Sequence, residues 1–171
     1  MLRQALIINS WGKNIYVKIP VVNSKGKFSG KVINKLSKKG IKLNITAVYT
    51  VNQVKKILNN INKKSKTIIS IFSGRMSDVG KDPIPIIKES VRMTKKMKKV
   101  EILWASTREV LNIFQAENTG CQIITVPNEI LKKLSGIGVD LEQLSLETVS
   151  TFYKDATIAG YTIKTKKSYK K

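Results

Sequence analysis

Tyr16-Val17-Lys18-Ile19-Pro20 sets a lysine in the middle of an apolar, β-prone run that extends over residues 15–22. A strand that is buried on both faces reads as a nearly continuous series of Val, Ile and Leu. A lysine in such a strand must pair, reach water or lose its charge. Desolvation favours the neutral amine, which is the nucleophile that attacks a carbonyl to form a Schiff base. The alternative is an edge-strand lysine that faces solvent.

The segments around this run alternate between strand and helix. The expected strands are residues 14–19, 42–48, 67–73, 100–105 and 121–126. The expected helices are residues 1–9, 28–39, 50–62, 83–98, 107–118 and 145–159, with short helical pieces from Asn128. This alternation predicts right-handed βαβ units and a parallel sheet. The chain has no Gly-x-Gly-x-x-Gly phosphate turn, which weakens a dinucleotide-binding interpretation.

The spacing of these units favours part of a closed barrel. The repeat is about 30 residues, and a closed (β/α)8 barrel takes about 250 residues, or about 31 per unit. The sequence therefore predicts an α/β fold of the parallel (β/α)8 TIM-barrel type that is incomplete, with about five βα units. We expect residues 1–161 to form this partial barrel and residues 162–171 to be a basic, disordered tail.

The composition excludes several kinds of site. The chain has 171 residues, one cysteine (Cys121), no histidine and a formal net charge of +21. A single cysteine forms no disulfide within the chain, and the lack of histidine argues against a zinc site and a His-based triad. No apolar run approaches the roughly 18 residues of a membrane span, and residues 1–9 hold too short an apolar core for a signal peptide. We expect a cytoplasmic protein of one domain without a metal.

The positive charge is dispersed along the chain. A pI near 10.1 is a first sign of a nucleic-acid-binding protein. Yet 28 of the 32 basic residues are lysines spread over the whole sequence, and only residues 164–171 form a compact basic run. Dispersed charge is weaker support than a patch. A nucleic-acid-binding function is therefore the less favoured alternative.

Polar side chains gather near the carboxyl ends of the predicted strands. Side chains alternate along a strand, so each strand has one apolar face and one face that carries polar groups. We expect the polar faces to hold Tyr16 and Lys18, Asn44 and Thr46, Ser70 and Phe72, and Trp104 and Ser106, with Ala47, Leu103 and Ala105 on the apolar faces. Arg75 and Arg108 follow two of these strands. Inward-facing residues at this end of a barrel line its active site.

These candidates also have structural interpretations. Ser106-Thr107-Arg108-Glu109 has the form of a capping box, although a helix N-terminus beside an arginine also attracts phosphate. Asn44 and Thr46 fit hydrogen-bonded core residues equally well. Arg75 fits a solvated loop.

No carboxylate stands at a predicted strand end. Asp78 and Asp82 are interpreted as turn and cap residues rather than as acids. Schiff-base chemistry needs a general acid or base, and the chain has no histidine to replace a carboxylate. The predicted sheet also leaves two open edges, at residues 14–19 and 121–126, which invite pairing with another chain.

Four strand-end motifs, in this order, resemble those of the transaldolase family, which includes the fructose-6-phosphate aldolases. The motifs are Tyr16-Val17-Lys18-Ile19-Pro20, Asn44-Ile45-Thr46-Ala47-Val48-Tyr49, Ser70-Ile71-Phe72-Ser73-Gly74-Arg75 and Trp104-Ala105-Ser106-Thr107-Arg108. The resemblance covers about residues 10–161. It implies a cofactor-free (β/α)8 barrel of which this chain supplies strands four to eight.

The resemblance implies the catalytic roles. It makes Lys18 the Schiff-base lysine on the family's fourth strand and gives Thr46 the placing of the catalytic water. It implies that Asn44 and Ser70 hold substrate hydroxyls.

The resemblance also implies the phosphate site and the reaction type. Arg75, Ser106 and Arg108 would bind the substrate phosphate. Phe72 stands where aldolase-type members carry a tyrosine and transaldolases a phenylalanine, which favours group transfer over aldol cleavage.

The implied activity is transfer of a dihydroxyacetone unit between sugar phosphates in the non-oxidative pentose phosphate pathway. The implied substrates are of the fructose 6-phosphate, erythrose 4-phosphate and sedoheptulose 7-phosphate class. The family's proton-moving aspartate and glutamate lie on the first three strands, which precede this chain. We therefore expect negligible turnover from this chain alone, and either a homo-oligomer or a need for the N-terminal part. The alternatives are an inactive fragment with a structural or interaction role and a lyase of the fructose-6-phosphate aldolase type.

Overall fold

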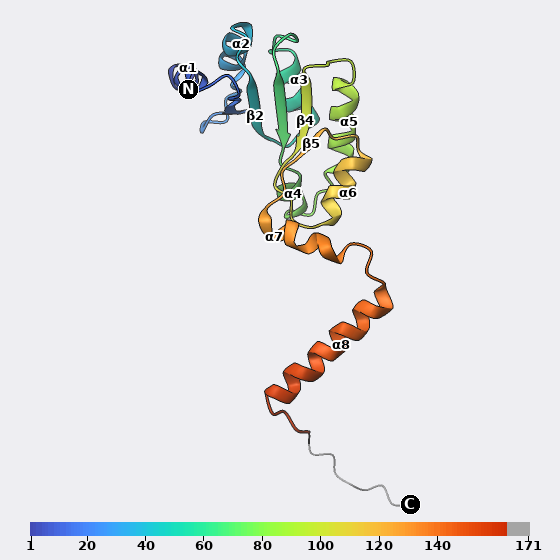
Figure 1. Ribbon diagram of the computed structural model, residues 1–171. Coiled ribbons are helices and arrows are strands. Elements are labelled where there is room, and N and C mark those ends of the chain that lie inside the picture. Colours follow the sequence, from blue (N-terminus) through green and yellow to red (C-terminus); the bar gives the residue numbers. More distant parts are fainter. Residues whose placement is uncertain (164–171) are drawn as a thin grey trace, which may run out of the picture. The chain divides into compact units, whose positions relative to one another are not determined.

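The computed structural model describes residues 1–163, in which strands and helices alternate (Figure 1). The chain divides into two compact units, Met1–Lys132 and Lys133–Lys171. The domain predicted over residues 1–161 spans both units and stays a prediction. Of the tail predicted at residues 162–171, residues 164–171 lie outside the described part.

The first unit is built on a five-stranded parallel sheet. Its strands are β1 (Val17–Pro20), β2 (Leu43–Val48), β3 (Thr67–Ile71), β4 (Val100–Trp104) and β5 (Ile123–Ile124). Their order across the sheet is β1-β2-β3-β4-β5, the same as their order in the chain. The predicted parallel α/β fold is confirmed, and the sheet is consistent with a partial barrel of the (β/α)8 type.

Helices connect the strands and continue beyond the sheet. They are α1 (Leu2–Ser10), α2 (Gly30–Lys38), α3 (Val51–Leu58), α4 (Ser73–Ser77), α5 (Ile84–Thr94), α6 (Leu111–Asn118), α7 (Asn128–Leu131), the 3-10 helix η1 (Lys132–Gly136) and α8 (Leu141–Ile158). Within the described residues, no helix has both the length and the apolar character to cross a membrane.

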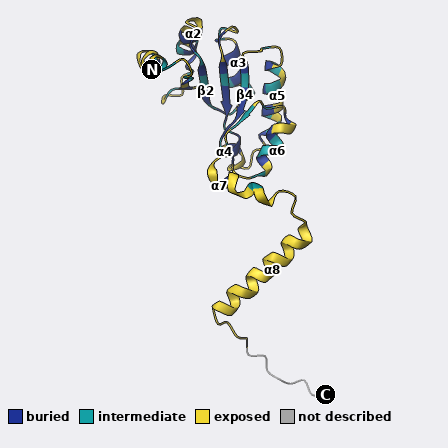
Figure 2. Ribbon diagram, in the orientation of Figure 1, coloured by how far each residue is buried: buried dark blue, intermediate teal, exposed yellow. Residues whose placement is uncertain are grey.

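The hydrophobic core lies between the sheet and the helices that connect its strands. Alternate residues of the strands, such as Ile45 and Ile69, are fully buried there, together with Ile33 of α2, Ile57 of α3 and Ile87 of α5. The buried residues follow the strands and the inner sides of these helices, as Figure 2 shows. One face of the sheet is therefore covered by helices, as in a βαβ fold.

The strand faces differ from the prediction on β4 and β2. Trp104 is fully buried and is the register partner of Ile71, so it lies on the core face, whereas Leu103 pairs in register with Ser70. The prediction that grouped Trp104 with the polar face and Leu103 with the apolar face is wrong, because register partners in a parallel sheet point to the same side. Ala47 is also misassigned. It has a positive φ of 58° in a bulge of β2.

The cap predictions had mixed outcomes. Thr50 and Gln53 form the predicted capping box at the start of α3. The capping box predicted at Ser106 is wrong, because α6 begins only at Leu111 and Ser106 has a φ of 66°. Instead, the backbone N–H groups of Arg108 and Glu109 donate to Oδ1 of Asn112 at 2.9 and 3.3 Å.

Helices α4 and α8 also differ from the sequence expectation. Helix α4 follows β3 directly, over residues that were assigned to a strand end and a loop. Helix α8 begins at Leu141, with Asp140 as its side-chain cap, rather than at Ser145. Helix α8 starts earlier than expected because Asp140 accepts hydrogen bonds from two backbone N–H groups of its first turn. Ser145 lies inside the helix and cannot cap these groups.

Candidate functional site

Three predicted site residues meet on one face of the sheet. Lys18 of β1 and Asn44 of β2 are register partners, so their side chains leave neighbouring strands on the same side. The Ser70 hydroxyl of β3 donates to Oδ1 of Asn44 at 2.7 Å. Ser70 is buried and Asn44 is partly buried. An amine, an amide and a hydroxyl therefore come from three consecutive strands.

Lys18 itself is exposed on β1, the first strand in the order of the sheet. No ion pair joins it to a carboxylate among the residues that the structure describes. It lines a mostly apolar pocket of about 380 Å³ between β1 and α1, together with Ile8, Trp11 and Ile19. The lysine therefore reaches water in this chain, as the edge-strand alternative expects, and it borders an apolar cavity.

Thr46, at the carboxyl end of β2, carries a buried hydroxyl with no partner. The residue is 9% exposed, and its Oγ1 makes no hydrogen bond with any described residue. Buried polar atoms are nearly always hydrogen-bonded to protein or to ordered water. The Thr46 hydroxyl is therefore enclosed in this chain, on the strand next to Lys18.

Arg75 and Phe72 adjoin at the start of α4. The Arg75 guanidinium carbon lies 5.9 Å from the centroid of the Phe72 ring, a cation–π contact. The Phe72 ring in turn lies 5.9 Å from the Tyr49 ring at an interplanar angle of 57°. Helix α4 thus holds an exposed arginine beside an aromatic pair, directly after the strand that carries Ser70.

Ser106 and Arg108 line a second pocket after β4. This pocket has a volume of about 380 Å³ and is also lined by Thr107, Thr125 and Pro127. Thr107 is buried and donates its hydroxyl to the Thr125 carbonyl at 2.6 Å. The pocket therefore combines a guanidinium with hydroxyl groups, a donor set suited to an anion.

The candidates fall into two groups that no described hydrogen bond or ion pair joins. The first group comes from β1, β2 and β3, and the second comes from the segments after β3 and β4. Because the strands are parallel, their carboxyl ends lie at the same end of the sheet, and both groups lie on or just after these strand ends. In α/β folds, ligands bind beyond the carboxyl ends of the strands.

Three residues that contact the second group were not predicted as site residues. Asp78 forms an ion pair with Arg108 at 2.7 Å, although the sequence suggested only a turn role for it. Asn112 is 4% exposed and holds the Arg108 backbone. Gly74 lets α4 approach the Ser106 loop, since a Cβ built on it would lie 1.6 Å from the Ser106 carbonyl oxygen. In the sequence, the glycine of Gly74-Arg75 is the one sign that α4 comes close to the Ser106 loop.

Two titratable groups near the sheet have altered proton affinity. Burial raises the pKa of the Tyr16 phenol, and the negative charge of Glu101 raises it further. Burial also raises the pKa of the Cys121 thiol, although backbone hydrogen bonds oppose that effect. Cys121 is therefore a thiol rather than a thiolate nucleophile near neutral pH.

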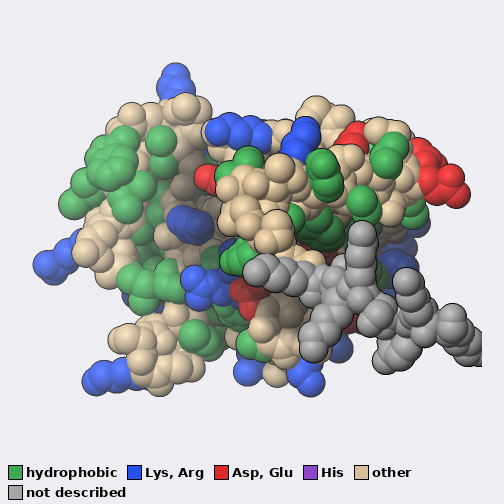
Figure 3. Space-filling model, turned by 90° about the horizontal axis from the view of Figure 1, so that it is seen from below, with side chains coloured by type: hydrophobic (Ala, Val, Ile, Leu, Met, Phe, Trp, Pro, Cys, Tyr) green, Lys and Arg blue, Asp and Glu red, His purple; other side chains and the backbone are tan. Residues whose placement is uncertain are grey.

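The basic side chains do not form one continuous patch on the face drawn in Figure 3. Lysine and arginine side chains there stand in several separate groups. This distribution agrees with the dispersed charge of the sequence.

Comparisons with known proteins place the chain in a family. Residues 1–169 match the family described as Transaldolase/Fructose-6-phosphate aldolase. A probable transaldolase of Dehalococcoides mccartyi is 35% identical over 135 residues, which cover 78% of this chain and 59% of the relative. A probable transaldolase of a Thermoanaerobacter species is 34% identical, with the same coverage of both chains. Probable transaldolase 2 of Listeria monocytogenes is 33% identical over 78% of this chain and 58% of its own length.

The chain thus spans less than two thirds of the length of the curated relatives that it matches. The family match extends over nearly the whole of it. The parallel α/β sheet agrees with the fold that the strand-end motifs implied. This chain therefore belongs to the transaldolase/fructose-6-phosphate aldolase family.

Proposed function

We propose that this chain carries the Schiff-base and phosphate-binding half of a transaldolase, which transfers a dihydroxyacetone unit between sugar phosphates. The observation that supports this most is the pairing of Lys18 with Asn44 in register, with Ser70 donating to the same amide. This arrangement sets an amine beside polar groups that suit the hydroxyls of a ketose. The family match adds support, since the matched relatives are described as probable transaldolases.

In this proposal, Lys18 is the nucleophile. The lone pair of its neutral Nζ attacks the C2 carbonyl of a ketose phosphate, and loss of water leaves an iminium ion between Nζ and C2. A base then takes the proton of the C4 hydroxyl, the C3–C4 bond breaks, and the positive iminium accepts its electron pair. An aldose phosphate leaves, and the three-carbon unit stays on the lysine until an acceptor aldose takes it.

Thr46 and the polar pair assist this chemistry. Thr46, on the strand next to Lys18, places the water that enters and leaves with the iminium. Asn44 and Ser70 hold hydroxyl groups of the three-carbon unit. Arg75, Ser106 and Arg108 bind the phosphate at the other end of the substrate, and Phe72 favours transfer over release as free dihydroxyacetone.

The proton-transfer group comes from outside this chain in our proposal. Iminium formation and bond cleavage both need a general acid or base. Lys18 has no carboxylate partner among the described residues. We infer that turnover requires further residues, and that this chain alone is limited to substrate binding and a slow Schiff-base step.

The experiment is reductive trapping of the iminium. Incubation of the 171-residue chain with fructose 6-phosphate and borohydride should leave a reduced adduct on Lys18, mapped by peptide mass spectrometry. The Lys18→Met variant should give no adduct, and Lys56→Met, which removes an exposed lysine of α3, should label like the wild type. Adducts spread over the surface lysines would refute the assignment of Lys18.

A structural or interaction role is the second candidate. The exposure of Lys18 on β1 favours it, because this amine reaches water as the other exposed lysines of the chain do. The same trapping experiment decides between the two functions.

A further inference from the structure

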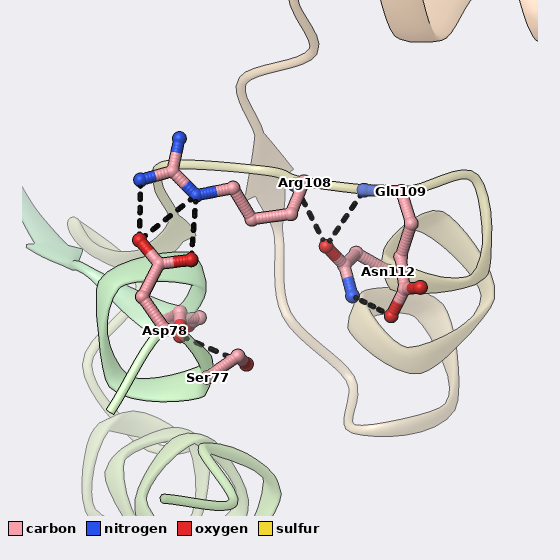
Figure 4. A network of polar contacts seen from close by, with 6 residues as sticks. Ser77, Asp78, Arg108, Glu109 and Asn112 are labelled. Carbon is pink, nitrogen blue, oxygen red and sulfur yellow. Dashed lines mark hydrogen bonds and ion pairs between the residues drawn. The ribbon is translucent and has the colours of Figure 1, made fainter. Parts of the chain in front are cut away.

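The ion pair between Arg108 and Asp78 joins the segments that follow β4 and β3 (Figure 4). Arg108 donates from Nη2 to Oδ2 of Asp78 at 2.7 Å, and from Nε to Oδ1 and Oδ2 at 3.2 Å each. Both side chains are about half exposed, at 47% and 48%. An exposed pair of this kind contributes little to folding stability. Its importance therefore lies in where it holds the guanidinium.

The backbones on both sides of this pair are held in place. The N–H of Arg108 donates to Oδ1 of Asn112, a residue that is 4% exposed. On the other side, Gly74 brings α4 so close to the Ser106 loop that a Cβ on it would overlap the Ser106 carbonyl oxygen and lie 3.0 Å from Cγ of Arg108. Asp78 follows α4 directly as its C-cap residue. The carboxylate and the guanidinium thus meet because fixed backbone segments bring them together.

The geometry divides the five N–H donors of the guanidinium into two sets. Asp78 occupies the edge formed by Nε and Nη2. Nη1 makes no hydrogen bond with any residue in the described part of the chain, and Arg108 lines the pocket beside Ser106 and Thr107. The edge between Nη1 and Nη2 therefore keeps donors for a second anion. A planar guanidinium can serve two oxyanions at once through different edges.

We propose that Asp78 is a positioning residue for the phosphate site. Its carboxylate holds the edge of the Arg108 guanidinium formed by Nε and Nη2, and this directs the edge formed by Nη1 and Nη2 at the phosphate of the substrate. This inference rests on the proposed phosphate role of Arg108. Without Asp78, the guanidinium would lose its anchor and sample several rotamers, and phosphate binding would then bear the cost of ordering it.

An Asp78 that does not position Arg108 would have the opposite effect on phosphate binding. A carboxylate beside an anion site repels the anion, so removal of a bystander Asp78 would strengthen phosphate binding. Removal of a positioning Asp78 weakens phosphate binding. The two roles differ in the sign of the change.

The test measures the Kd of the whole chain for fructose 6-phosphate and for fructose by calorimetry. Asp78→Ala should weaken fructose 6-phosphate binding about threefold to fivefold, the equivalent of an exposed ion pair. It should leave fructose binding unchanged, which a general loss of structure would not do. Asp78→Asn keeps one acceptor oxygen for Nε–H, so its Kd should stay within about twofold of the wild type.

The matched control is Asp82→Asn. This substitution removes the same charge four residues further along the chain. The Asp82 side chain accepts the N–H of Ile84, and asparagine can keep that hydrogen bond. Its Kd for fructose 6-phosphate should equal that of the wild type. Equal or tighter binding by Asp78→Ala, with selectivity for the phosphate still lost in Arg108→Ala, would overturn the role of Asp78 alone. A wild-type chain that binds both sugars equally would overturn the phosphate role of Arg108, and the role of Asp78 with it.

Discussion

Gly74 is a residue at which the two arginine-bearing segments approach closely. Its N–H faces the carbonyl of Ala105 at 3.4 Å, and a Cβ would meet the backbone of Ser106 rather than a flexible side chain. Backbone atoms cannot move aside without shifting the whole loop. The glycine is thus required here by space and not by its φ, since no positive φ occurs at this position.

Gly74→Ala should lower the free energy of unfolding by about 3 kcal/mol, the upper part of the range for overpacking. The reason is the 1.6 Å approach of the added Cβ to the Ser106 oxygen. Urea denaturation followed by circular dichroism measures this change. Gly136→Ala is the control, because a Cβ there meets open space and should change stability little. Equal stability of both variants would mean that the Ser106 loop adapts freely.

At the scale of single elements, the predictable parts of the chain were those set by local chemistry. The strands and most helices follow from the apolar pattern, and the start of α3 follows from the Thr50 capping box. Helix α4 was missed because five residues are too few to show a helical period. The bulge at Ala47 and the core position of Trp104 depend on pairing with neighbouring strands, which the local sequence does not contain.

The same division applies to the candidate site. Lys18, Asn44 and Ser70 were predicted as candidates because polar residues are conspicuous in apolar strands, and two of the three are joined by a hydrogen bond. The partners of Arg108 were not found. Asp78 lies 30 positions away in the sequence, so only the packing of α4 on the loop after β4 reveals the pair.

The capping box of α3 gives a prediction for one element. Thr50→Ala should lower the free energy of unfolding by about 1 kcal/mol, because the Gln53 N–H loses the oxygen that accepts it at the helix start. Thermal unfolding monitored by circular dichroism measures the change. Lys56→Ala in the same helix alters an exposed side chain without touching the cap, and should leave the midpoint nearly unchanged. Equal unfolding midpoints for the two variants would mean that the cap makes no measurable contribution to the free energy of unfolding.

At the scale of the whole molecule, each of the two units by itself carries exposed apolar side chains. Helix α8 exposes Phe152 at 66% and Tyr153 at 74%, and every described residue of this helix is exposed (Figure 2). In the first unit, β1 has a strand neighbour on only one side among the described residues, and Trp11 of the preceding segment is 70% exposed. Exposed apolar patches and open strand edges both favour association.

We therefore predict that the isolated chain self-associates and binds a hydrophobic dye. Size-exclusion chromatography with light scattering should give a mass above that of one chain, 19.2 kDa. Phe152→Ser should lower the dye fluorescence, since it removes exposed apolar area, whereas Lys154→Ser should not. A monomer with no dye signal would contradict this prediction.

The strand order of the sheet bears on how the chain folds during synthesis. Each strand pairs with the strand made just before it, so no pairing waits for a distant segment. Because consecutive strands are neighbours in the sheet, the contacts between strands join residues that are close in the sequence for a parallel sheet. Short sequence separation between contacting residues favours rapid folding. As the nascent chain leaves the ribosome, each new βα unit finds its docking surface already present. The sheet can therefore grow one unit at a time, from β1 toward β5, with its newest strand and the outer side of β1 open at each stage.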